Sequence, residues 1–194
     1  MTEPPVGTTP LDPDESEGLL PRHITTRGEL DEWENQNILQ AAQWLAARRR
    51  TDLLTDHFVR ELHRRMFDET WAWAGAYRRS DKNIGLHWPE IPPAVRNLCE
   101  DATTWFAKSV FPTRQAAARL HHRLVAIHCF SNGNGRHARL YTDAVLDSIE
   151  QVRFEWGRSD LHARGSARDA YLAALRAADA GDYQELFKFL GCIE

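Results

Sequence analysis

Apolar residues recur at intervals of three and four along most of the chain, which is the spacing that places them on one face of an α-helix. The first such stretch covers about residues 27–49 and includes Trp33 and Ala41, with Thr26 and Glu29 at capping-box spacing at its start. The same periodicity predicts further helices over about 55–67, 94–108, 113–128, 135–148, 166–178 and 182–190. The pattern therefore predicts a mainly α fold.

Two segments interrupt the helical pattern. Residues 1–23 are rich in proline and contain the acidic run DPDESEG, so we expect an extended N-terminal lead segment followed by one domain over 24–194. Residues 75–93 combine glycines, prolines and the polar run RRSDKN, and they predict a flap that is a short β-hairpin or an ordered loop. The expected architecture is a single-domain helical bundle with this flap attached.

Composition and charge narrow the class of protein. The chain has 194 residues, 42% of them hydrophobic, which is enough for one compact core. A net charge of −4 and a pI near 6.1 give no reason to expect a direct nucleic-acid partner or an anionic membrane. The sequence contains no apolar run of the roughly 20 residues that a membrane span needs, and no secretory signal pattern at its start. We therefore expect a cytoplasmic protein.

One segment, HCFSNGNGRHAR at 128–139, combines residue types that act together in phosphate chemistry. The turn Gly133-Asn134-Gly135 lets backbone N–H groups converge without Cβ atoms in the way, and the helix that follows contributes its positive N-terminal end. This junction is suited to bind an anion, and a phosphate is the natural ligand.

Three further side chains extend that site. Arg136 and Arg139 are three residues apart in the first turns of the following helix, so they share a face and present forked donors to a di- or triphosphate. His128 ends the preceding helix, and an imidazole with an ordinary pKa near 6.5 is suited to accept a proton from an attacking hydroxyl. The segment thus combines an anion cradle, a charge clamp and a base.

This segment resembles the signature of the Fic/Doc (Fido) family, HxFx(D/E)GNGRxxR, at every defined position except 132. The stretches LHRRMFDETWAWAGAYRR at 62–79 and DAYLAALRAADAGDYQELFKFL at 169–190 resemble other parts of the same family. Together with GTTPLDPDESEGLLPRHIT and ELDEWENQNI near the N-terminus, they make the chain similar to the subgroup called mobile mystery protein B. That subgroup is found beside a helix-turn-helix partner, mobile mystery protein A.

The resemblance implies a Fic-type fold and a protein adenylyltransferase, with ATP as substrate and Mg²⁺ as metal. Such an enzyme moves AMP to a Ser, Thr or Tyr hydroxyl of a target protein, here as the toxin-like half of a two-gene module. His128 is implied as the base and Phe130 as the anchor of the loop in the core. The ATP phosphates are implied to bind Gly133, Asn134, Gly135, Arg136 and Arg139.

By the same resemblance, the flap binds an extended segment of the target protein as an added strand and brings its hydroxyl to His128. The flap residues implied in this docking are Arg79, Ser80, Asp81, Lys82, Asn83, Ile84 and Gly85.

Asn132 departs from the family pattern. Where the family has Asp or Glu holding Mg²⁺, this chain has a neutral amide, which is a weaker ligand for a hard cation. Asn132 is thus a weak Mg²⁺ candidate, and two alternatives to AMP transfer stay open. One is a catalytically weak or inactive Fic-like protein that binds nucleotide or a partner, and the other is transfer of a phosphoryl or phosphocholine group.

Many members of the family are inhibited by a glutamate in an (S/T)xxxE(G/N) helix that pairs with the second arginine of the signature, here Arg139. No complete match occurs in this chain, and the partial matches place the glutamate at Glu29, Glu17 or Glu34. Surface or capping carboxylates are the favoured interpretation of all three. The hypothesis that follows is that an inhibitory glutamate lies in this N-terminal region or on the partner protein.

Two other patterns compete with this interpretation. Residues 133–138 fit GxGxxA, a dinucleotide-binding variant, but that fingerprint needs a preceding strand and the residues before it have helical periodicity. His121 and His128 are two helical turns apart, yet no carboxylate or cysteine completes a tetrahedral zinc set with them. Neither pattern accounts for the whole segment.

Overall fold

A computed structural model describes residues 16–47, 51–156 and 165–193 of the chain, and residues 1–15 of the expected lead segment lie outside this range. Its helices confirm the mainly α fold, and each starts and ends close to its predicted position. They are α2 (Arg27–Ala46), α3 (Asp56–Phe67), the 3₁₀ turn η1 (Trp88–Glu90), α4 (Ile91–Ala107), α5 (Thr113–Ile127), α6 (Asn134–Ser148), α7 (Ser166–Asp179) and α8 (Gln184–Phe189).

The starts of α2 and α3 follow from local sequence. At α2 the Thr26 side chain accepts the Glu29 N–H at 3.2 Å, and Glu29 Oε2 accepts the Thr26 N–H at 2.9 Å. This is the capping box that the sequence predicts. At α3 the Thr55 hydroxyl accepts the Phe58 N–H at 3.1 Å.

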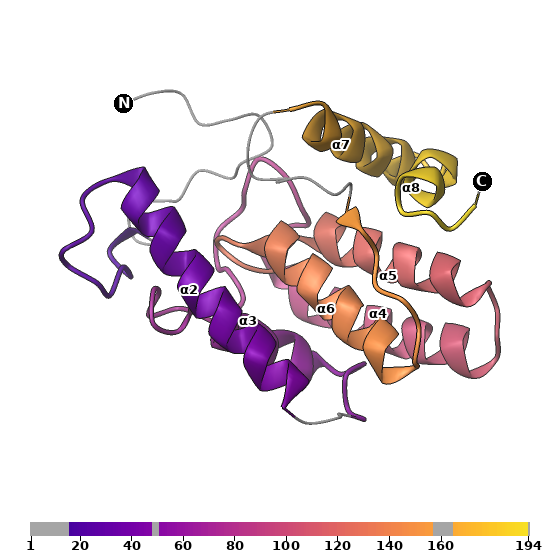
Figure 1. Cartoon of the computed structure of the whole chain (residues 1–194), viewed down its shortest axis with the longest axis horizontal. Helices are drawn as coiled ribbons and strands as arrows, with labels where there is room; N and C mark the ends of the chain where they lie inside the picture. Colours follow the sequence, from indigo (N-terminus) through magenta and orange to yellow (C-terminus); the bar gives the residue numbers. More distant parts are fainter. Residues whose placement is uncertain (1–15, 48–50, 157–164, 194) are drawn as a thin grey trace.

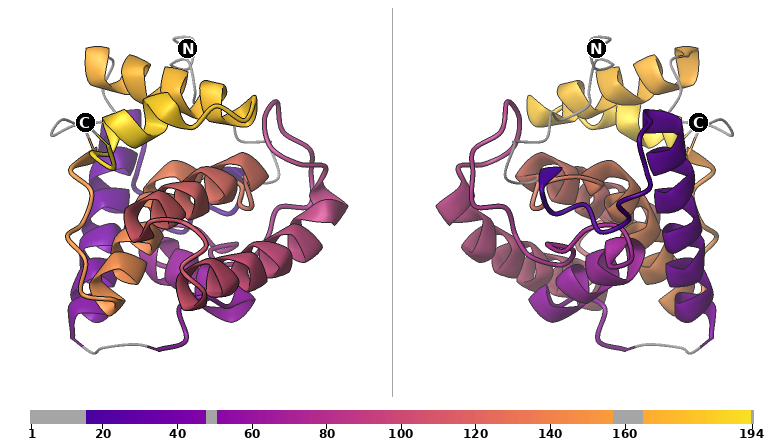
Figure 2. Two further views of the ribbon diagram at one scale, coloured as in Figure 1. Left: turned by 90° about the vertical axis from the view of Figure 1, so that its right-hand side faces the viewer. Right: turned by 90° about the vertical axis from the view of Figure 1, so that its left-hand side faces the viewer.

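The helices form a bundle with α5 at its centre. α5 packs against α4 and α6, while α3 joins α2 to α4 and α6. Figures 1 and 2 show α2 along one side of the bundle and α7 with α8 across one end. The core accordingly has two parts, a larger one between α3, α4, α5 and α6, and a smaller one under α7 and α8. The segment that joins α5 to α6 contributes Cys129 and Phe130 to the larger part.

The inward face of α2 is both polar and apolar. Its fully buried residues are Glu34, Asn37 and Ala41, and its side chains Leu30, Ile38, Trp44 and Leu45 pack against the core, so hydrogen bonds and apolar contacts together fix its position on the bundle. Asn37 Oδ1 accepts the Glu69 N–H at 3.1 Å, and its amide donates to the Arg65 carbonyl at 3.3 Å. Within the described ranges, neither α2 nor another helix has the length and apolar character that a membrane crossing requires.

The predicted flap is present as a loop before η1, but its two arms do not pair as strands within the described residues. Instead, each arm bonds to the end of α5. The Arg78 N–H donates to the Cys129 carbonyl at 3.0 Å, and the Leu86 N–H donates to the Ile127 carbonyl at 3.3 Å. The Arg78 side chain donates to Ser80 O at 2.7 Å and to Leu86 O at 2.5 Å, so a guanidinium lies where cross-strand bonds would form.

The described end of the lead segment contacts the residues after α3. Leu19 and Trp71 form an isolated antiparallel bridge, and the Ala72 N–H donates to the Gly18 carbonyl at 2.8 Å. The lead segment is therefore attached to the domain at this point.

Candidate active site

His128 lies where α5 ends. Its backbone is left-handed, with φ of 55°, and the Arg78 Nε–H donates to its carbonyl at 2.7 Å. Burial lowers the pKa of the imidazole to about 4, with the charges of Arg78 and Lys82 acting in the same direction. At neutral pH the ring is uncharged, which is the form that accepts a proton. The predicted base is thus in the required protonation state.

The Asn134 side chain acts within the loop. Its Nδ2 donates to the Phe130 carbonyl at 2.7 Å, and its Oδ1 accepts the Phe130 N–H at 2.9 Å. Both ends of the buried amide are used, so a contribution of Asn134 to phosphate binding falls to its backbone. Phe130 is fully buried in the core, which is the position that the sequence resemblance implies.

His63 of α3 is a loop contact that the sequence analysis missed. The Gly75 N–H donates to its Nδ1 at 3.0 Å, so Nε2 carries the proton and donates to the Asn132 carbonyl at 3.1 Å. Its ring stacks on Phe130 with centroids 3.7 Å apart. Burial holds the pKa of His63 well below its ordinary value. A histidine on the apolar face of α3 was the signal in the sequence.

The two glycines of the turn have different surroundings. Gly133 has φ of +77°, and a Cβ there would lie 2.4 Å from Phe67 Cζ, so only glycine fits. A Cβ on Gly135 would have Arg139 Nη1 as its nearest neighbour, at 3.7 Å, which leaves room beside the first turn of α6. The first N–H groups of a helix have no intrahelical partner. This open turn is the best place in the loop for a phosphate.

Arg136 and Arg139 have separate partners. The Arg136 guanidinium lies over the Phe67 ring, 5.1 Å from its centroid, and donates to Glu34 Oε2 at 2.6 Å. Arg139 hydrogen-bonds the Tyr171 hydroxyl of α7, and burial lowers the pKa of its guanidinium. The structure brings both arginines to the first turns of α6, as predicted.

Glu34 is the N-terminal glutamate that reaches the loop. It is 2% exposed, and its Oε1 accepts the Trp71 Nε1–H at 2.7 Å and the Asn132 Nδ2–H at 2.9 Å. Its arginine partner is Arg136 rather than the expected Arg139. Of the other two predicted glutamates, Glu29 belongs to the exposed cap of α2 and Glu17 is exposed.

The donor set does not fit an Mg²⁺ ion held by this loop. Asn132 Oδ1 accepts the Gly133 N–H at 2.7 Å while its Nδ2 donates to Glu34, so the amide predicted as a weak metal ligand is already used. The adjacent carboxylate of Glu34 is paired with Arg136. No group of three or more potential His, Cys, Asp or Glu ligands occurs in the described part of the chain.

The flap lies directly against His128. A Cβ on Gly85 would be 2.5 Å from His128 Cβ, and Gly85 itself has φ of +94°. Asp81 closes the loop by accepting the Trp88 N–H at 2.8 Å and bonding His87 Nδ1 at 2.6 Å. The predicted docking residues Arg79, Asp81, Asn83, Ile84 and Gly85 are exposed, and Ser80 and Lys82 are half-buried.

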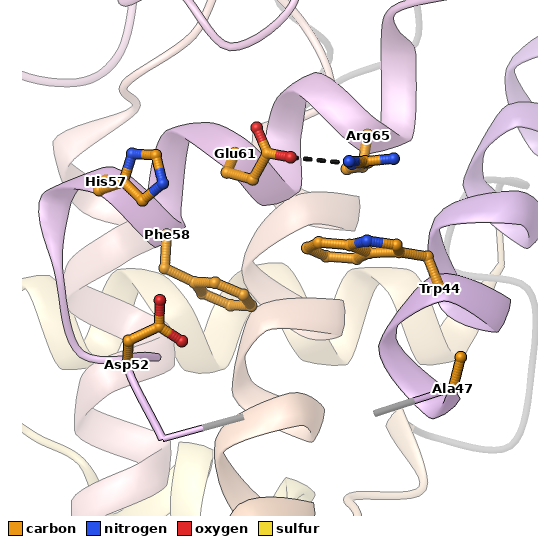
Figure 3. A pocket seen from close by; sticks show the side chains of 7 residues that line it. All are labelled: Trp44, Ala47, Asp52, His57, Phe58, Glu61 and Arg65. Atoms are coloured by element: carbon orange, nitrogen blue, oxygen red, sulfur yellow. Dashed lines mark hydrogen bonds and ion pairs between the residues drawn. The ribbon is translucent and has the colours of Figure 1, made fainter. Parts of the chain in front are cut away.

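A pocket of about 520 Å³ opens between α2 and α3, away from the loop. Figure 3 shows Trp44 and Phe58 on its walls, with Glu61 bonded to Arg65. Glu61 also pairs with Arg64 at 2.7 Å, so its charge is already neutralised. None of the residues 128–139 lines this pocket, and it does not form part of the candidate active site.

Comparison with known proteins places the sequence near one family. Residues 53–146 match the Fic/DOC family. The chain is 29% identical over 150 residues to the protein adenylyltransferase Fic of Aedes aegypti and 30% identical over 151 residues to that of Culex quinquefasciatus. Each match covers 75% of this chain and 29% of the relative, so the chain spans under a third of the length of these relatives.

Solved structures give the same fold. The BepC protein of Bartonella tribocorum, with bound AMPPNP, superposes with a TM-score of 0.72 at 15% identity, covering 92% of this chain and 96% of that one. A Fic-domain signalling protein of Bacteroides thetaiotaomicron superposes with a TM-score of 0.60 at 22% identity, covering 84% and 66%. The family resemblance of the sequence is supported: residues 53–146 of the chain match the Fic/DOC family, and its fold is that of solved Fic-domain proteins.

Proposed function

We propose that this chain transfers AMP from ATP to a Ser, Thr or Tyr hydroxyl of a target protein. One observation carries the proposal. A six-residue loop has the buried, neutral imidazole of His128 at one end and an open helix N-terminus with two arginines at the other. Relatives named protein adenylyltransferase Fic support the same reaction.

In the proposed step, His128 accepts the proton of the target hydroxyl as that oxygen forms a bond to the α-phosphorus of ATP. The bond from the α-phosphorus to the oxygen that bridges to the β-phosphate breaks, and pyrophosphate leaves with that electron pair. The N-terminal turn of α6 and the guanidinium groups of Arg136 and Arg139 stabilise the charge that develops on the phosphate oxygens. Asn134 and His63 keep the loop in place during the step.

The flap is proposed to bind the target. Its exposed residues include Ile84, 45% exposed, and Trp88 of the adjoining η1, 41% exposed, so an extended segment has apolar contacts available beside His128. The close approach of Gly85 to His128 brings a bound segment near the base. A hydroxyl carried by that segment is then within reach of the imidazole.

Glu34 is proposed to inhibit the reaction. Its carboxylate occupies the guanidinium of Arg136, which we assign to the ATP phosphates, and it is held there by two further donors. Productive ATP binding then requires that Glu34 leave Arg136. From sequence resemblance we also propose the mobile mystery protein B subgroup and a helix-turn-helix partner with which this chain forms a two-gene, toxin-like module. From composition and sequence pattern we propose a cytoplasmic location.

A labelling experiment with the Glu34→Gln variant tests the function. The variant is incubated with bacterial lysate and ATP labelled on the α-phosphate, and we expect label on protein that disappears in Glu34→Gln/His128→Ala. Label transferred from the γ-phosphate instead would indicate phosphoryl transfer. ATP binding without any transfer would favour the second candidate function, a nucleotide-binding interaction protein. The structural observation that supports this candidate is the tight pairing of Glu34 with Arg136.

A further inference from the structure

We propose that Asn132 and Glu34 are a matched pair, in which the amide of the loop locks α2 onto the phosphate site. Residue 132 then controls when the site opens, in place of a metal-binding role. The regulatory meaning of this lock rests on the proposed function, whereas its existence is a structural question that can be tested without any transfer reaction.

The amide of Asn132 is oriented by two contacts that require a donor and an acceptor. Its Oδ1 faces the Gly133 N–H at 2.7 Å, so Nδ2 is the atom that faces Glu34 Oε1, at 2.9 Å. An aspartate at position 132 keeps the first contact but turns the second into two carboxylate oxygens facing each other. Glu34 is 2% exposed, so solvent screens this repulsion poorly.

Glu34 receives donors from three parts of the chain. These are Trp71 after α3, Asn132 in the loop and Arg136 in α6. The fully buried residues of α2 are Glu34, Asn37 and Ala41, while Leu30, Ile38, Trp44 and Leu45 pack against the core as partly buried side chains. Glu34 is the charged residue among the buried ones, so its three donors add to this apolar packing in holding the helix.

The three donors differ in how ATP affects them. In the proposed function the ATP phosphates compete with Glu34 for Arg136, but a phosphate that binds this guanidinium leaves the bonds from Asn132 and Trp71 intact. Asn132 thus keeps α2 docked when an ATP phosphate has bound Arg136 but the other two bonds of Glu34 remain. A carboxylate at position 132 removes that hold, so an acidic residue there and a docked Glu34 exclude each other.

Amide hydrogen exchange of residues 27–46 in the nucleotide-free protein tests the pair. We expect Asn132→Asp to speed exchange of α2 about tenfold or more, because it adds repulsion, and Asn132→Ala to speed it about threefold, because it removes a hydrogen bond. Asn35→Asp makes the same chemical change on the exposed face of α2 and is the control, with exchange unchanged.

In the double variant Asn132→Asp/Glu34→Gln, position 34 carries a neutral amide, so the introduced aspartate no longer faces a second carboxylate. In the Glu34→Gln background, Asn132→Asp is therefore expected to speed exchange less than about threefold. Equal effects of Asn132→Asp in both backgrounds, or no effect in the wild type, would overturn the proposal. Hydrogen exchange does not depend on AMP transfer, so failure of the proposed function leaves these outcomes interpretable.

Discussion

Arg136 Nη2 lies 2.6 Å from Glu34 Oε2 and joins α6 to α2 across 102 positions of sequence. The side chains are 14% and 2% exposed, respectively. Breaking a buried pair by removing one partner costs about 3–5 kcal/mol, since the other charge stays buried. Glu34→Gln keeps an oxygen for the Trp71 and Asn132 donors, which makes it the milder way to open the site.

The two turn glycines are predicted to respond differently to alanine. Gly133→Ala combines a positive φ with a Cβ 2.4 Å from Phe67 Cζ, and we expect it to lower the free energy of unfolding by about 2–4 kcal/mol. Gly135→Ala has room for its Cβ and is expected to leave stability within about 1 kcal/mol while weakening ATP binding at least tenfold. Urea unfolding and calorimetric ATP titration measure the two quantities. Equal loss of stability in both variants would argue against this account of the turn.

His63 is predicted to act by positioning the loop. His63→Phe keeps the ring that stacks on Phe130 but loses the bonds to Gly75 and the Asn132 carbonyl. In the Glu34→Gln background we expect kcat for AMP transfer to fall about tenfold, because His128 and α6 are no longer held in register. His63→Gln retains one N–H donor and is expected to recover part of that loss. A purely structural role would lower stability in both variants with kcat unchanged.

Asn134→Asp tests whether the side chain of Asn134 acts within the loop. The carboxylate still accepts the Phe130 N–H but no longer donates to the Phe130 carbonyl, so a buried carbonyl loses its partner. We expect the free energy of unfolding to fall by about 1–3 kcal/mol. The change is read from urea unfolding without nucleotide. If stability is unchanged and only ATP binding falls, the amide contacts phosphate instead.

Buried histidines predict acid sensitivity. Burial lowers the pKa from 6.5 to about 4 for His128 and His137 and to about 3 for His121. The unfolded chain therefore takes up protons below pH 6.5 that the folded chain does not, so stability is complete above this pH and is lost as pH falls toward 4. Each group contributes a slope of up to about 1.4 kcal/mol per pH unit. Urea midpoints at about pH 7.5, 6 and 5 measure the loss, and constant midpoints would refute it.

Much of the fold could be predicted from sequence because its signals are local. Helical periodicity, the Thr26–Glu29 capping box and the Thr55 cap depend on residues within a few positions of one another. The turn at 133–135 was predictable for the same reason. A positive φ at Gly133 and the start of α6 at Asn134 follow directly from that short pattern.

Contacts within the site were less predictable, because they join distant segments. His63 reaches Asn132 across 69 positions, and Glu34 reaches the same residue across 98. No local pattern specifies which glutamate of the N-terminal region reaches the loop, since that depends on how α2 packs on α3. Asn134 shows a different limit: its residue type fits both a phosphate ligand and a partner of the Phe130 backbone, and only the geometry distinguishes them.

Calorimetric titration of ATP into the wild type and Glu34→Gln is the most direct test that the loop is a polyphosphate site closed by Glu34. The control is Glu32→Gln, the same change at an exposed position of α2. We predict that Glu34→Gln binds ATP at least about tenfold more tightly than the wild type and Glu32→Gln. Equal affinity in all three proteins, or no binding to Glu34→Gln, would contradict the account.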